Sequence, residues 1–208
     1  FLSAFSDGTT SNLYDIFINS KTRKINLGGN SISSWNPNYR GHPIWISLDG
    51  LDNSNITQPM IDTVRSMIIN ELKRIFGFGD NSPELKEFND RVKSRLVQQR
   101  KQMEDYLNSP PMFGFRSGSG GGWLSNLEIL GKDSDFRKSL VMKKDFAFAE
   151  SQLATNTNIW KNLIDYCEFL KVTPYAVGSS PDPDMVTQMK VSKEARLAGY
   201  AADFEKKY

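Results

Sequence analysis

The chain has 208 residues, of which 38% are hydrophobic and 24% charged, with a formal net charge of +2. This is a globular rather than a disordered composition, and the near-neutral balance excludes attraction of the whole molecule to polyanions. The single cysteine, Cys167, excludes an intramolecular disulfide, and no apolar run is long enough to cross a bilayer. We therefore expect a soluble protein of the cytoplasm or of a particle, in a non-disulfide compartment and without membrane insertion.

The first quarter of the chain predicts a small antiparallel sheet. Residues 12–18 are apolar and rich in β-formers, and residues 24–27 alternate, which is typical of a hairpin. The residues between 28 and 42 are interpreted as a loop. Residues 43–48 (PIWISL) alternate again, with the isoleucines and the leucine on one face. We expect about three short strands that bury one face against helices.

Two long helices follow in the sequence. Residues 57–76 carry apolar side chains at spacings of three and four, with Thr57 as the N-cap, and this stripe is broad enough to cover the sheet. Residues 82–107 begin with Ser82 and Pro83, a strong helix-start signal. The apolar stripe of this second helix is narrow, so we expect the helix to project from the body or to pack on a partner helix.

Residues 109–122 are rich in Pro and Gly and predict a linker or loop. Beyond it we expect helices over about 134–153 and 158–171. A last helix opens at Asp182, and its apolar side carries Met185, Met189, Leu197, Tyr200, Ala201 and Phe204. The predicted fold class is α+β, with a small antiparallel sheet packed on helices and a mainly helical C-terminal part. The predicted parts are 1–108 (sheet and two long helices), 109–122 (linker or loop) and 123–208 (helical part).

The residues that support catalysis are scarce. His42 lies at a loop-to-strand junction where it could act as a general base, so an enzyme with a site near His42 is one alternative. Cys167 lies among apolar neighbours in a predicted helix, where a buried and inert thiol is expected. One histidine and one cysteine do not complete a zinc site, and no loop has the calcium-binding pattern. We assign no catalytic residue, no metal site and no cofactor.

The clearest functional signal is a basic face in the middle of residues 82–107. Cations beside aromatic side chains in a Gly-rich segment are typical of nucleic-acid binding, whereas interspersed acidic residues are typical of a solvated helix face. The candidate nucleic-acid-binding residues are Arg91, Lys93, Arg95, Arg100, Lys101 and Arg116. The candidate partner-binding residues are Leu96, Met103, Phe113, Phe115 and Trp123.

These observations favour a structural or interaction subunit of a larger protein assembly over an enzyme. A long helix with a thin apolar stripe, a Gly-rich segment and few reactive side chains are common in subunits of virions and similar particles. The expected partners are other protein subunits, including further copies of the chain. The main alternative is a nucleic-acid-binding module that uses the basic face and the Gly-rich segment.

Overall fold

The computed structural model describes residues 1–36, 42–108 and 142–207. The described part is an α+β fold, as expected from the sequence, and its sheet has two strands where about three were predicted. Its elements, in chain order, are α1 (Leu2–Ser6), α2 (Asn12–Phe17), β1 (Ser31–Trp35), β2 (Trp45–Asp49), the 3-10 turn η1 (Asn53–Asn55), α3 (Gln58–Phe76), α4 (Pro83–Asn108), α7 (Met142–Ala154), α8 (Trp160–Tyr166) and α9 (Met185–Lys207).

The two strands pair antiparallel, with Ser31 opposite Asp49 and Trp35 opposite Trp45. The strand predicted from residues 43–48 is confirmed as β2. Its apolar side chains lie half-buried on one face while Trp45 and its neighbours on the other face are exposed, so the alternation also predicted the correct faces.

The hairpin predicted from residues 12–18 and 24–27 is wrong. Residues 12–17 form helix α2, because the Ser11 hydroxyl caps its first turn by accepting a hydrogen bond from the Tyr14 amide. Residues 24–27 are irregular. The partner of β2 is instead the serine-rich segment β1, interpreted from sequence as loop, in which Ile32 is the buried side chain. The described sheet therefore has two strands.

The long helices are confirmed close to their predicted bounds. Helix α3 follows Thr57 and ends at Phe76, where Gly77 takes the C-cap position. Helix α4 begins at Pro83, and the Ser82 hydroxyl accepts a hydrogen bond from the Leu85 amide at 3.2 Å, as a cap should. The starts of both long helices were therefore predicted correctly from the sequence.

The C-terminal helices agree with the predictions in part. The structure describes α7 from Met142 onward, so the start predicted near residue 134 lies outside the described residues. Helix α8 is shorter than the predicted 158–171, because the chain turns at Glu168, whose φ of +57° lies in the left-handed region. The predicted linker, 109–122, also lies outside the described residues.

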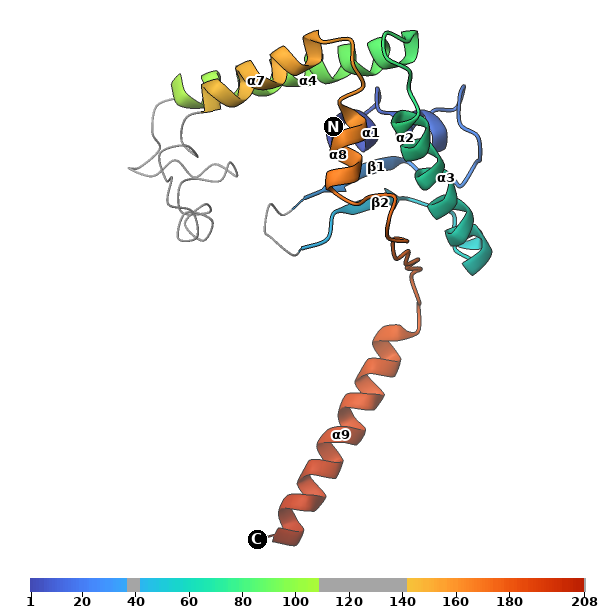
Figure 1. Cartoon of the computed structure of the whole chain (residues 1–208). Helices are drawn as coiled ribbons and strands as arrows, with labels where there is room; N and C mark the ends of the chain where they lie inside the picture. Colours follow the sequence, from blue (N-terminus) through green and yellow to red (C-terminus); the bar gives the residue numbers. More distant parts are fainter. Residues whose placement is uncertain (37–41, 109–141, 208) are drawn as a thin grey trace.

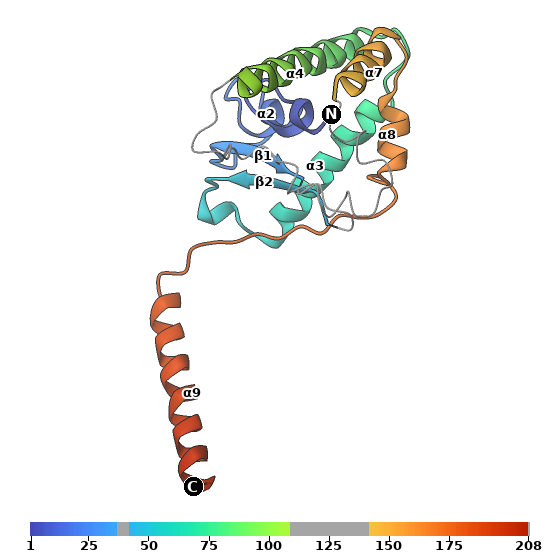
Figure 2. The same ribbon diagram turned by 90° about the vertical axis from the view of Figure 1, so that its left-hand side faces the viewer.

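Helices stacked on the sheet form the body of the protein. Helices α4 and α7 run side by side along one edge, and α1 packs between α4 and the sheet (Figures 1 and 2). Helices α1 and α2 both pack on β1, while α3 packs on α2 and α8. The sequence predicted that residues 57–76 would cover the sheet. In the structure, the short helices α1 and α2 cover most of it.

An aromatic cluster holds the helices of the body together. Phe88 of α4 is fully buried, and its ring meets the Trp160 ring edge-on at 5.3 Å, with Phe1 and Phe5 stacked beside them. Asn158, also buried, donates its side-chain amide to the carbonyls of Ile75, at 2.9 Å, and of Phe78, at 3.1 Å. Because helix C-termini leave carbonyls without intrahelical donors, this asparagine anchors the start of α8 to the end of α3.

Candidate functional site

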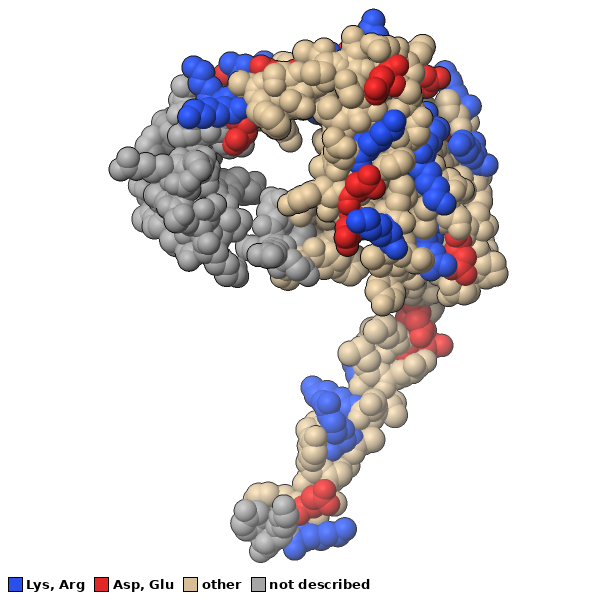
Figure 3. Space-filling view, in the orientation of Figure 1, with Lys and Arg blue, Asp and Glu red and all other residues tan. Residues whose placement is uncertain are grey.

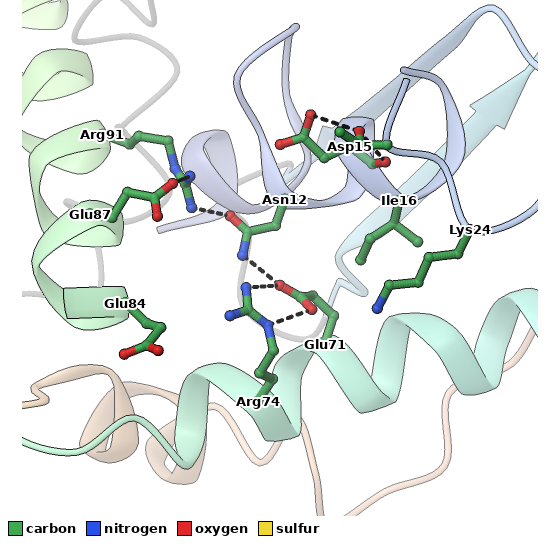
Figure 4. Close-up of a pocket in the computed structure, with 10 residues that line it drawn as sticks. Asn12, Asp15, Ile16, Lys24, Glu71, Arg74, Glu84, Glu87 and Arg91 are labelled. Carbon is green, nitrogen blue, oxygen red and sulfur yellow. Dashed lines mark hydrogen bonds and ion pairs between the residues drawn. The ribbon is translucent and has the colours of Figure 1, made fainter. Parts of the chain in front are cut away.

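A polar cavity of about 270 Å³ opens between α2, α3 and α4 (Figure 4). Most of the residues that line the cavity lie on these three helices, so the packing of the helices sets the shape of the cavity. Its lining residues are Asn12, Asp15, Ile16, Thr22, Lys24, Glu71, Arg74, Glu84, Glu87 and Arg91.

A chain of hydrogen bonds crosses the wall of this cavity. Arg91 donates through Nη2 to Oδ1 of Asn12 at 2.6 Å, and Asn12 donates through Nδ2 to Oε1 of Glu71 at 2.5 Å. Arg74, one turn further along α3, donates to both carboxylate oxygens of Glu71 at 2.6 and 2.9 Å. Arg91 also pairs with Glu87 at 2.7 Å, so the network links α2, α3 and α4 (Figure 4).

The charges in the network are compensated within the fold. Glu71 is only 4% exposed, and a carboxylate at that depth needs charged donors. The hydrogen bond to Glu71 raises the pKa of the Arg74 guanidinium, against a smaller opposing effect of burial. The Nε atom of Arg91 is buried without a hydrogen-bond partner. The arrangement is that of a joint between three helices, because Glu71 is paired with Arg74 and Glu87 with Arg91 within it.

Two residues of the predicted basic face also serve the fold. Arg91 belongs to the network just described. Arg95 donates to the backbone carbonyl of Asp7 at 2.9 Å and to the hydroxyl of Thr10 at 3.3 Å, which holds the α1–α2 turn against α4. Neither guanidinium is exposed as a free surface charge.

The remaining basic residues lie nearer the solvent. Lys93 is ion-paired with Asp90 at 3.5 Å, and Arg100 contacts both Glu104 and Glu150, which ties α4 to α7. Lys101 is exposed. Arg116 lies outside the described residues. Binding of nucleic acid by this face thus stays a prediction that draws chiefly on Lys93, Arg100 and Lys101.

Of the predicted partner-binding residues, Leu96 is half-buried and packs against the core. The described parts of the chain do not include the side chain of Met103, nor Phe113, Phe115 and Trp123. These remain predictions.

The two reactive residues are both at the surface. His42 is exposed immediately before β2. Cys167 is exposed at the C-cap of α8, which corrects the expectation of a buried thiol, and partial desolvation raises its pKa above the ordinary value. Within the described ranges, no group of three or more His, Cys, Asp or Glu side chains is placed to hold a metal ion.

No family model matches the chain, and no curated protein or solved structure is significantly similar to it. Inferences about function therefore depend on the surfaces of the molecule itself.

An extensive apolar surface of the described residues belongs to α9, which extends away from the body in both ribbon views (Figures 1 and 2). Every residue from 185 to 206 is exposed. In the space-filling view the helix forms a separate arm on which uncharged surface predominates (Figure 3). Its exposed large apolar side chains are Met185, Val186, Met189, Val191, Leu197, Tyr200 and Phe204.

Sequence reasoning recognised the apolar side of this helix but made no prediction of what covers it. The signal that could have identified it as a surface is the segment before it, residues 173–182, which contains two prolines and no regular structure. This segment passes over α3, where Gly178 lies against the side chains of Ile56 and Ile61.

None of the helices in the described part of the chain combines the length and the apolar character that crossing a bilayer requires.

Proposed function

We propose that this protein is a non-enzymatic interaction subunit of a larger protein assembly and that α9 is the arm with which it docks. The observation that carries the proposal is the exposure of the whole helix. Leu197 is 51% exposed, Met189 61% and Tyr200 64%, although each is a residue type that contributes well over 1 kcal/mol when fully buried (~1.5–3 kcal/mol).

Within the part of the chain that the structure describes, helix α9 has no packing to stabilise its apolar side chains. Most helical stability in proteins comes from packing of an apolar face rather than from intrinsic propensity. Helix α9 contains Gly199, which costs about 1 kcal/mol relative to alanine, and the β-branched Val186, Thr187 and Val191. A partner that covers the apolar side chains supplies the missing stabilisation.

The size of the exposed surface matches a protein interface. A helix of 23 residues is roughly 35 Å long at 1.5 Å per residue. Six of the seven large apolar side chains fall within about 120° of the helix circumference, with Val191 on the opposite side, and six are more than a soluble monomer usually leaves in one continuous patch. The extended segment 173–182 gives the arm reach, so the helix can engage a neighbour without disturbing the core.

The test is site-specific photo-cross-linking in the native host. A photoreactive amino acid replaces Met189 or Leu197 in the full chain, and a matched control replaces the exposed Lys86 on α4. We expect protein–protein cross-links in high yield from both α9 positions and little from the control. Equal, low yields from all three positions would contradict a docking role for α9.

A further inference from the structure

Helix α9 has two faces that differ in the size of their apolar side chains. Successive residues turn by about 100°, so Met189, Tyr200 and Leu197 fall within an arc of about 80°, which also holds Phe204 and the charged Lys193. The opposite side of the helix, about 180° away, carries only smaller apolar residues within an arc of about 60°. These are Val191, Ala195, Ala198 and Ala202. Both faces are exposed along their whole length.

From these two faces we propose that α9 docks against α9 of a second copy of this chain, in parallel, with the bulky face of one helix on the small face of the next. The proposal rests on the proposed function and names its partner. In a parallel copy at the same height, Leu197 faces the gap between Ala195 and Ala198, and Tyr200 faces the gap between Ala198 and Ala202. Small residues allow the two backbones to approach, while bulky ones fill the space between them.

Charged residues along the two faces favour the parallel arrangement. Viewed down the axis of α9, Lys190 lies at one edge of the bulky face, and Glu194 lies at the edge of the small face on that same side of the helix. On the other side of the helix, Asp203 lies at the edge of the bulky face and Lys206 at the edge of the small face. In a parallel pair, Lys190 therefore meets Glu194 of the neighbour, and Asp203 meets its Lys206. Each pair is separated by about one turn or less along the axis, roughly 4.5–6 Å.

An antiparallel pair through the same two faces reverses this pattern. Turning the neighbour end for end brings its Lys206 beside Lys190 and its Glu194 beside Asp203, so like charges meet on both sides. Within the described part of the chain, these four side chains make no ion pair with one another or with the body. Their charges are thus available to a second copy.

The two docking faces of each helix are different, so the contact is heterologous. A contact of this kind leaves one face open at each end and continues until it closes into a ring or extends into a filament. The purified protein is therefore expected to form species larger than a dimer.

The experiment is sedimentation velocity on the full chain from about 1 to 100 µM, with variants that block one face at a time. Leu197→Asp blocks the bulky face and Ala198→Arg blocks the small one, whereas Ala201→Gln, about 90° from both faces, is the matched control. We expect assembly of the wild type and of the control, and at least tenfold weaker assembly of each blocked variant alone. Mixing the two blocked variants leaves one compatible pair of faces, so the mixture should give a 1:1 dimer.

The orientation has its own test. Lys190→Glu should weaken assembly, and Lys190→Glu combined with Glu194→Lys should restore it. A wild-type chain that is monomeric at 100 µM overturns the proposal, as does a mixture of blocked variants that stays monomeric. If the purified chain is monomeric while Met189 and Leu197 cross-link to a different protein in the host, self-docking fails and the proposed function stands.

Discussion

Replacing Asn12 with alanine should weaken the packing of the three helices that meet at the polar cavity and destabilise the protein. The Asn12 side chain is 5% exposed and is the link between Glu71 on α3 and Arg91 on α4. The substitution removes two hydrogen bonds to charged groups, each contributing about 1.5–3 kcal/mol. Glu71 keeps Arg74, and the Arg91 side chain is 23% exposed and can turn partly to solvent. We therefore expect the loss to be about 2–4 kcal/mol rather than the full sum.

For a chain of this size, that loss corresponds to a fall in Tm of roughly 5–15 °C. Urea unfolding followed by circular dichroism measures the free energy of unfolding directly. The matched control is Asn53→Ala, an exposed asparagine on η1, which should stay within about 0.5 kcal/mol of the wild type. A double-mutant cycle of Asn12→Ala with Arg91→Ala should show a coupling energy of about 0.5–3 kcal/mol. An Asn12→Ala chain as stable as the control would refute the role of the network as a joint.

Three further outcomes test other parts of the structure. Phe88→Ala should destabilise the protein by about 3–5 kcal/mol in urea unfolding, because its ring is fully buried in the aromatic cluster, and a loss below 1 kcal/mol would contradict that packing. Arg95→Ala should lower the free energy of unfolding by about 1–2 kcal/mol in the same measurement, because the substitution frees the α1–α2 turn. The control Lys101→Ala should leave the stability unchanged. Equal effects of the two substitutions would mean that Arg95 is a surface charge like Lys101. Cys167 should react with iodoacetamide in the native protein, as followed by mass spectrometry. The pH midpoint of its reaction rate should lie above that of an unstructured cysteine peptide, because desolvation disfavours the thiolate. A midpoint at or below the peptide value would argue against this environment.

The errors in predicting the sheet have a clear physical origin. The segment from Asn12 to Phe17 has the composition of a strand, but the Ser11 cap and the contacts of its helix with β1 and α3 outweigh a β-propensity that spans only about 1 kcal/mol. Strand β1 contains three serines and a single buried isoleucine, so its hydrophobic pattern is too weak to read without its partner strand. Pairing between strands is a long-range property that a local pattern cannot encode alone.

The cavity was also beyond sequence reasoning. Its central hydrogen bonds join residues 59 and 79 positions apart in the chain. Arg91 was recognised as a candidate, but as a free cation on a helix face. Only the packing of α2 on α3 and α4 shows that its guanidinium is turned inward.

By itself the sequence determined the elements that depend on local chemistry. The Ser82 cap and the amphipathic periodicity of residues 57–76 and 82–107 defined α3 and α4, because capping and amphipathic spacing act within a few residues. The tertiary structure decided which apolar faces find a partner within the chain. The face of α4 that carries Phe88 is buried, whereas the equally recognisable apolar side of α9 is left exposed. Burial depends on what the rest of the chain can reach, and that is settled only when the whole chain is folded.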